Sequence, residues 1–217
     1  MNKHISEIIK ILEKTYPDAK IELDFGDNFQ LLVAVILSAQ CTDVRVNKVT
    51  PALFEKLPDV RAVAGATLDE IEKFIYSTGF YRAKAKNIKA AAEKILKNFK
   101  GKVPSKMDEL LTLPGVARKT ANVVLSSGFD KDEGIVVDTH VARISGKLGL
   151  VEKKMALQKN AVKIEQELMK IVPKSKWGKF SHMIVWHGRR VCFARKPNCK
   201  GCPLNKICPS SEGKICK

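Results

Sequence analysis

The chain has 217 residues, 45% of them hydrophobic, which suffices for the core of one large or two small domains and excludes a disordered chain. Its 39 Lys and Arg residues outnumber 23 Asp and Glu residues, leaving a net charge of +16. Because such an excess repels itself in a compact fold, we expect a polyanionic partner. Nucleic acid is the leading candidate, an acidic membrane surface is its rival, and a merely soluble basic surface is the alternative to both.

Residues 1–16 have the spacing of apolar side chains that is typical of an amphipathic helix rather than of a signal peptide. The longest apolar run, residues 31–37, is far shorter than the ~18 residues that a membrane span requires. We therefore expect a cytoplasmic protein with no membrane partner, in which cysteine thiols stay reduced.

The helical spacing of apolar residues continues along nearly the whole chain, and only residues 134–137 suggest extended structure. Thr67 and Glu70 have the spacing of a capping box, and Gly79 and Gly101 are placed to end helices. The predicted fold class is therefore all-α. The expected helices, in chain order, are residues 1–16, 28–39, 43–56, 67–76, 82–98, 106–112, 117–126, 139–146, 154–172 and 179–188.

Residues 111–117 (Leu-Thr-Leu-Pro-Gly-Val-Ala) connect two of these expected helices. Because Pro fixes φ and Gly accepts a positive φ, Pro114 and Gly115 allow a tight turn. The backbone N–H groups of residues 115–117 would then point outward at a helix N-terminus, where they could bind a DNA phosphate without reading the base sequence. The alternative is an ordinary corner between two helices.

Lys119 falls in the first turn of the helix that follows this connection. A cation there meets the positive end of the helix dipole, which favours the uncharged amine, and only the uncharged amine is a nucleophile. A position that is unfavourable for structure is therefore favourable for covalent chemistry. The alternative is a solvated lysine that contacts a phosphate.

Asp138 follows the apolar residues 135–137 and is placed to be the N-cap of the next helix. A capping carboxylate accepts backbone N–H groups and stays ionised, so it could accept a proton or stabilise a cation that forms on a sugar. A purely structural N-cap is the alternative.

Cys192, Cys199, Cys202 and Cys208 have the spacing C-x6-C-x2-C-x5-C, which in a reducing compartment predicts a metal site. Zinc favours four-cysteine structural sites, and the spacing matches neither ferredoxin pattern, so spacing alone favours zinc over an iron–sulfur cluster. Cys216, eight residues further on, is interpreted as a spare thiol.

In combination, these residues resemble the endonuclease III family, the iron–sulfur branch of the helix-hairpin-helix DNA glycosylases. The resemblance runs from about Phe25 to Cys208, and it is highly specific because all of its motifs occur in the family's order. The motifs are residues 37–43 (Leu-Ser-Ala-Gln-Cys-Thr-Asp), 113–121 (Leu-Pro-Gly-Val-Ala-Arg-Lys-Thr-Ala), 137–140 (Val-Asp-Thr-His) and the four-cysteine loop.

The resemblance implies two helical domains with a DNA-binding cleft between them. Residues 22–132 would form a six-helix barrel that carries the hairpin, and residues 1–21 and 133–217 a discontinuous domain that ends in the cysteine loop. It also implies that the four cysteines hold a [4Fe–4S] cluster in place of zinc. The protein would be a monomer that acts on damaged double-stranded DNA in the nucleoid.

The resemblance further implies a bifunctional DNA glycosylase and abasic-site lyase for oxidised or ring-saturated pyrimidines. Lys119 would attack the sugar C1′ and displace the base, and the Schiff base would then allow β-elimination on the 3′ side of the lesion. Asp138 would help to deprotonate the lysine or stabilise the sugar cation. Gln40 would fill the gap that the flipped base leaves, and Phe80 would stand beside the lesion. The other implied DNA contacts are Gly115, Val116, Ala117, Arg118, Thr120, His140 and Lys200.

Three residues depart from the family's pattern: Ala117 replaces a second hairpin glycine, Phe80 a smaller aliphatic residue and Cys41 a small residue. The nearest rivals are sister glycosylases for mismatched adenine or thymine. Lys119 argues against both, and Ala34 stands where the adenine enzyme carries Glu. The rival from another class is a non-catalytic DNA-binding protein with a structural zinc.

Overall fold

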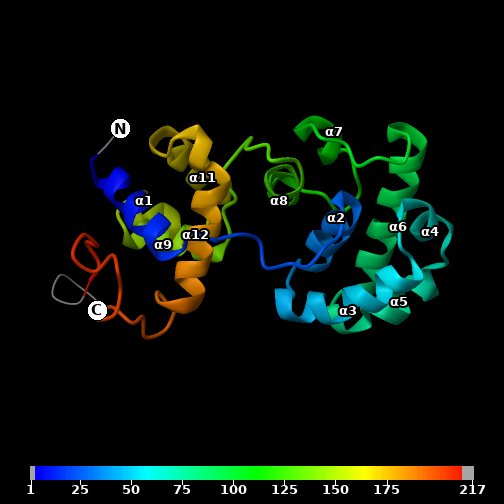
Figure 1. The fold of residues 1–217 in the computed structure, drawn as a ribbon, viewed down its shortest axis with the longest axis horizontal. Helices are drawn as coiled ribbons and strands as arrows, with labels where there is room; N and C mark the ends of the chain where they lie inside the picture. Colours follow the sequence, from blue (N-terminus) through cyan, green and yellow to red (C-terminus); the bar gives the residue numbers. More distant parts are fainter. Residues whose placement is uncertain (1–2, 212–217) are drawn as a thin grey trace. The chain divides into compact units, whose positions relative to one another are not determined.

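The computed structural model describes residues 3–211, and every regular element in that range is a helix (Figure 1). Residues 134–137, expected to be extended, form no strand. Cys216 and the first two residues of the expected N-terminal helix lie outside the described residues. The chain divides into a central unit, Glu22–Glu133, and a terminal unit that joins Met1–Ile21 to Gly134–Lys217. None of the described helices is long and apolar enough to cross a bilayer.

The central unit is built around α2, which is buried on all sides because nearly every one of its residues is apolar. The carboxylate of Asp27 caps its N-terminus by accepting from the backbone N–H groups of Phe29 and Gln30. The helices of this unit are α2 (Asn28–Leu37), α3 (Asp43–Lys56), α4 (Val60–Gly65), α5 (Leu68–Ile75), the 3-10 helix η1 (Tyr76–Thr78), α6 (Tyr81–Phe99), α7 (Met107–Leu111) and α8 (Arg118–Phe129).

Helix α8, which begins beside Lys119, is fixed by close packing on α2. Gly128 of α8 lies so near α2 that a Cβ on it would be 2.6 Å from the Oδ1 atom of Asn28. Ala121, Val124 and Leu125 of α8 are buried. The first turn of α8 is therefore held in place by the packing of the rest of the helix.

Local capping explains where the sequence-based expectations for this unit succeed and fail. The capping box of Thr67 and Glu70 is confirmed at the start of α5. Helix α4 was not expected, because its six residues are too few to display a helical period. Asp59 nevertheless starts it, since its carboxylate accepts from two backbone N–H groups of the first turn.

The terminal unit packs α1 and α9 against α12. Ile5, Ile8 and Leu12 of α1 share a core with Phe180 and Ile184 of α12. The helices of this unit are α1 (Lys3–Thr15), α9 (Thr139–Lys147), α10 (Lys153–Leu157), α11 (Ala161–Ile171), the 3-10 helix η2 (Lys174–Lys176) and α12 (Trp177–Arg190).

The expected single helix over residues 154–172 is wrong, because α10 ends at Leu157 and α11 begins at Ala161. Lys159 has a φ of 53°, which no right-handed helix accommodates. The side chain of Asn160 then caps α11 by accepting from the N–H of Lys163. A left-handed residue followed by a capping Asn thus divides the apolar pattern into two helices.

Candidate active site and cysteine cavity

The connection between α7 and α8 is a tight turn whose apolar side chains face the core. Gly115 has a φ of 77°, and a Cβ on it would lie 2.9 Å from the Cβ of Asn87, so only glycine fits there. Leu113 and Val116 are buried. The N–H of Val116 donates to the carbonyl of Leu113 at 3.2 Å, so this amide belongs to the turn and is not an outward-pointing donor as expected.

The N-terminus of α8 carries no side-chain cap. Ala117 is its N-cap residue, and its side chain makes no capping hydrogen bond. The first N–H groups of a helix have no intrahelical partner, so an anion can bind there. Ala117 has a φ of −90°, so its backbone conformation does not require a glycine. Its side chain is exposed, so the methyl group does not crowd the turn.

Lys119 is exposed and lies in the first turn of α8, as expected from the sequence. Its neighbours Arg118 and Thr120 lie in the same turn, the first exposed and the second half-buried. An amine, a guanidinium and a hydroxyl therefore accompany the uncapped end of one helix. This arrangement combines an anion-binding helix terminus with a potential nucleophile.

Gln40 and Phe80 lie at the ends of two other segments of the central unit. Gln40 follows α2 with a φ of 53°, and Phe80 precedes α6 with a φ of 50°. Both side chains are exposed, Phe80 by 67%. Lys84, which the sequence did not single out, donates hydrogen bonds into both segments, to the carbonyls of Leu37 and Thr78.

Asp138 is the N-cap of α9 in the terminal unit, which confirms that structural prediction. Its Oδ1 atom accepts from the N–H groups of His140 and Val141, both at 2.8 Å. The side chain is half-buried. Its carboxylate therefore has a fixed direction, set by two amide donors.

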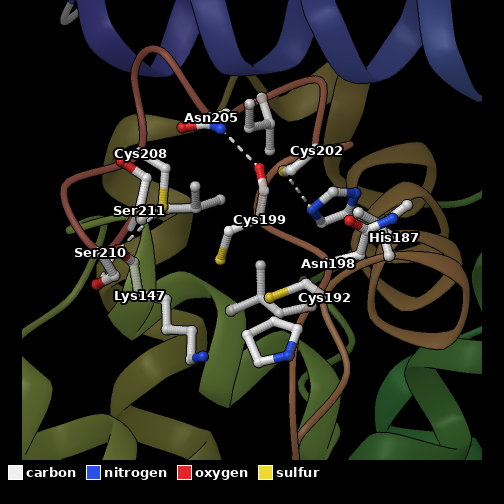
Figure 2. Close-up of a pocket in the computed structure, with 15 residues that line it drawn as sticks. Lys147, His187, Cys192, Asn198, Cys199, Cys202, Asn205, Cys208, Ser210 and Ser211 are labelled. Carbon is white, nitrogen blue, oxygen red and sulfur yellow. Dashed lines mark hydrogen bonds between the residues drawn. The ribbon is translucent and has the colours of Figure 1, made fainter. Parts of the chain in front are cut away.

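The four cysteines of the predicted metal site line one cavity of the terminal unit (Figure 2). Burial, with smaller contributions from the neighbouring thiols, raises the pKa of Cys202 to about 11. Burial likewise raises the pKa of Cys208. Without a metal these thiols keep their protons, so metal binding has to release them.

His187 forms one wall of this cavity and was missed by sequence reasoning. Its Nδ1 atom lies 3.0 Å from the hydroxyl of Tyr16, and its Nε2 atom lies 3.6 Å from the Sγ atom of Cys202. Burial and, to a smaller degree, Arg143 lower the pKa of His187 to about 4. The ring of His187 thus connects Tyr16, the residue after α1, to Cys202 of the cysteine loop, which is a structural role.

A basic groove lies beside the cysteine loop on the same unit. Thr139 and His140 at the start of α9 line it, and so does Lys196 of the loop. The cations along it, which the sequence did not identify as a group, are Arg143, Lys147, Lys153, Lys159 and Lys196. Lys200, expected to contact DNA, is exposed between two of the cysteines.

Comparison with known proteins relates nearly the whole chain to one family of DNA repair proteins. Residues 33–174 match the family described as HhH-GPD superfamily base excision DNA repair protein. The chain is 55% identical to the endonuclease III of Synechocystis sp. over 207 residues, which are 95% of this chain and 92% of that relative.

Two solved structures share the fold of this chain. One is described as a non-covalent endonuclease III–DNA complex and matches with a TM-score of 0.89 and 41% identity, covering 100% of both chains. The other is described as a trapped endonuclease III–DNA covalent intermediate and matches with a TM-score of 0.86 and 42% identity, covering 96% of each chain.

Proposed function

Because the chain belongs to the endonuclease III family of the HhH-GPD superfamily, we propose that it is a bifunctional DNA glycosylase and abasic-site lyase of base excision repair. Its proposed substrate is duplex DNA that contains an oxidised or ring-saturated pyrimidine, or an abasic site. The observation that carries the proposal is the exposed amine of Lys119 at the uncapped start of α8, in a fold shared with an endonuclease III trapped covalently on DNA.

In the proposed reaction, the damaged nucleotide leaves the base stack and the uncharged amine of Lys119 attacks the sugar C1′. The bond between C1′ and the base breaks, and the base takes the bonding electrons and a proton. The amine loses a proton, and the bond between C1′ and O4′ breaks, with O4′ taking the bonding electrons and a proton. The opened sugar is left with a protonated Schiff base between C1′ and Lys119. Loss of a C2′ proton then expels the 3′ phosphate, so the strand is cut on the 3′ side of the lesion.

Asp138 is proposed to accept the proton of the attacking amine or to stabilise positive charge on the sugar. The two amide donors of His140 and Val141 hold the carboxylate in a fixed orientation, which suits either task.

The remaining contacts are proposed to hold the DNA without reading its sequence. The start of α8 would bind a phosphate through its amides, with Gly115 and Ala117 shaping the approach. Gln40 and Phe80 would enter the base stack. Contacts to the backbone are proposed for Arg118, Thr120, His140 and Lys200 and for the basic groove. Val116 would contribute by packing the turn.

We also propose that Cys192, Cys199, Cys202 and Cys208 hold a [4Fe–4S] cluster. All four line one cavity, and four cysteine thiolates are the usual ligands of such a cluster. The relationship of the chain to the endonuclease III family favours the cluster over zinc. When bound, the cluster supplies four iron–thiolate bonds that cross-link the loop to the end of α12.

The domain roles follow from the same family. Glu22–Glu133 would be the barrel domain that carries the hairpin, and the terminal unit the cluster domain. The enzyme would act as a monomer on chromosomal DNA inside the cell.

Borohydride trapping tests the covalent step. Wild-type protein should become cross-linked to abasic-site duplex DNA, because borohydride reduces a Schiff base to a stable amine. Lys119→Ala should give no cross-link, whereas Lys97→Ala, which removes another exposed amine of the central unit, should cross-link like the wild type. Full cross-linking by Lys119→Ala would refute the assignment of the nucleophile, and failure of the wild type would refute the lyase function.

A further inference from the structure

Lys84 is a buried lysine whose hydrogen bonds go to two separate segments of the chain. It lies in the first turns of α6, and only 5% of its surface is exposed. Its Nζ atom donates to the carbonyls of Leu37 and Thr78, both at 2.8 Å. Its backbone N–H donates to the carbonyl of Phe80 at 3.1 Å. One residue thus holds the end of α2, the end of η1 and the start of α6.

These hydrogen bonds lie at the bases of the segments that present Gln40 and Phe80. Leu37 is three positions before Gln40, and Thr78 is two positions before Phe80. Both presented residues have a left-handed backbone, a strained conformation for any residue except glycine. Because both side chains are exposed, packing of their own side chains does not hold them, and the conformation depends on how the bases of the two segments are fixed.

A lysine is a costly choice for this buried position, which argues for a specific role. Desolvation by burial lowers the pKa of Lys84, and the nearby thiol of Cys41 opposes this only in part. An apolar residue would avoid this penalty but would leave the two carbonyls without their donor. The ammonium therefore gives a directional connection between two segments that an apolar residue cannot make.

We propose that Lys84 is a positioning residue that holds Gln40 and Phe80 in one geometry relative to each other, so that both act on the same distorted base step of DNA. This inference rests on the proposed function. It assigns Lys84 no contact with DNA and no part in the covalent chemistry.

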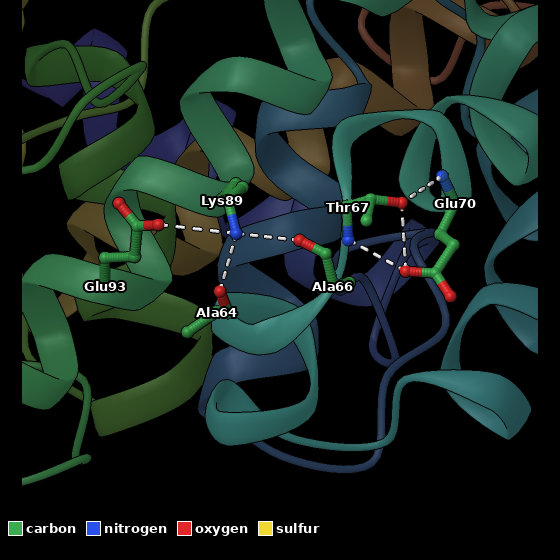
Figure 3. A network of polar contacts seen from close by, with 6 residues as sticks. All are labelled: Ala64, Ala66, Thr67, Glu70, Lys89 and Glu93. Atoms are coloured by element: carbon green, nitrogen blue, oxygen red, sulfur yellow. Dashed lines mark hydrogen bonds and ion pairs between the residues drawn. The ribbon is translucent and has the colours of Figure 1, made fainter.

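Lys89 provides a matched control on the same helix (Figure 3). Its Nζ atom also donates to two backbone carbonyls, those of Ala64 and Ala66, both at 2.7 Å. These carbonyls lie at the end of α4, away from Gln40 and Phe80 in the sequence. Lys84→Met and Lys89→Met each remove one ammonium group that donates to two carbonyls, and Lys89→Met also removes an ion pair with Glu93. A loss of activity that follows from general destabilisation should therefore appear in both variants.

The test compares strand cleavage at an abasic site in duplex DNA with cleavage at the same site in single-stranded DNA, under single-turnover conditions. Only the duplex has an opposite strand that Gln40 and Phe80 must separate from the lesion. Lys84→Met should lower the duplex rate by roughly tenfold to a hundredfold, the range expected when a group is misplaced by about 1 Å. Its single-strand rate should match that of Lys89→Met, whose ratio of the two rates should stay at the wild-type value.

A fluorescent base analogue supplies a readout that does not require chemistry. 2-Aminopurine placed opposite the abasic site becomes brighter when it is unstacked. Wild type and Lys89→Met should produce this increase on binding, and Lys84→Met should not. Equal losses of both cleavage rates in Lys84→Met, or an unchanged fluorescence increase, would overturn the proposal. If the wild type cleaves neither substrate, the proposed function fails, and the fluorescence still decides the role of Lys84.

Lys84→Arg keeps the proposal testable if Lys84→Met does not fold, because it keeps a positively charged donor in the same place but replaces the ammonium by a larger planar group. Lys84→Arg should lower the duplex rate and leave the single-strand rate at the wild-type value. Equal losses of both rates, or no loss of either, would overturn the proposal.

Discussion

The guanidinium of Arg143 donates to the backbone carbonyl of Cys192, with 2.7 Å between Nη1 and the oxygen. The same nitrogen lies 3.7 Å from the Sγ atom of Cys192. Arg143 belongs to α9, the helix that Asp138 caps. The cysteine loop is therefore attached directly to the helix that orients the proposed catalytic carboxylate.

The proposed iron–sulfur cluster absorbs visible light. Loss of one cysteine ligand should therefore remove the colour of the protein, and it should also destabilise the fold. Cys202→Ala should give a protein without visible absorbance and with a lower urea midpoint of unfolding, because the binding energy of a metal centre is part of the folding energy. Cys41 is a cysteine outside the cavity, so Cys41→Ala should stay coloured. Absorbance spectra and urea titrations measure both effects, and a coloured Cys202→Ala protein would contradict the proposed ligand set.

Asp138→Asn should separate capping from catalysis. Asn caps helices about as well as Asp, so the melting temperature should barely change. Turnover should fall by roughly a hundredfold or more, since an amide cannot accept the proton. Asp59→Asn is the matched control, because Asp59 caps α4 with the same pair of bonds to backbone N–H groups. Single-turnover cleavage at the wild-type rate in Asp138→Asn would mean that the carboxylate has only a structural role.

Ala117→Ser should raise the stability of the protein and lower its affinity for DNA. A serine hydroxyl at this N-cap can accept a first-turn N–H of α8, which typically stabilises a helix by about 0.5–2 kcal/mol. The same hydrogen bond would compete with a phosphate for that amide, so affinity for undamaged duplex should fall. Urea unfolding and fluorescence anisotropy measure the two quantities. Tighter DNA binding together with higher stability would show that the phosphate does not use this helix terminus.

Gly115→Ala should destabilise the protein more than Gly101→Ala. Both glycines have a φ of 77°, so alanine at either position carries backbone strain, on the order of 1–2 kcal/mol. At Gly115 the new Cβ would also lie 2.9 Å from the Cβ of Asn87, whereas at Gly101 the nearest atom, Cδ2 of Leu96, would be at an ordinary contact distance of 3.6 Å. Free energies of unfolding from urea titration should therefore differ between the two variants. Equal losses would exclude a contribution from the close approach of the turn to α6.

Glu70 should contribute to stability at neutral pH but not in acid. Hydrogen bonds to its carboxylate from the backbone and side chain of Thr67 lower the pKa of Glu70 below 4.5 (Figure 3). A lowered pKa in the folded state means that the contribution is complete above 4.5 and is lost as the pH falls through the folded value. Glu70→Ala should thus unfold more easily than the wild type at neutral pH, and the difference should shrink as the pH falls through the lowered pKa of Glu70. A constant difference in urea midpoint would contradict this linkage.

Features that depend on neighbours in the sequence were predictable. The capping box of Thr67 and Glu70 and the N-cap at Asp138 need only residues two or three positions apart, and the structure contains both. The division between α10 and α11 escaped notice because the apolar period continues across it. The left-handed backbone of Lys159 separates the two helices there, and lysine is not a residue type that predicts such a backbone.

Features that depend on distant contacts were not predictable from this sequence. Lys84 resembles any other lysine on a helix, and its acceptor at Leu37 is 47 residues away. The N–H of Val116 was expected to face outward, but it donates to the carbonyl of Leu113 because the turn is tighter than the residue types alone indicate. His187 likewise gains its place beside Cys202 only through the packing of α12.

The discontinuous terminal unit imposes an order on folding during synthesis. Ile5, Ile8 and Leu12 of α1 are buried in a core that they share with residues after Gly134. The ribosome adds about 5–20 residues per second, so α1 leaves it on the order of ten seconds before its partners exist. Glu22–Glu133 can fold within that interval as a contiguous stretch. The apolar side chains of residues 3–15 thus stay exposed on the nascent chain during that interval, and a chaperone that binds apolar segments can bind them there.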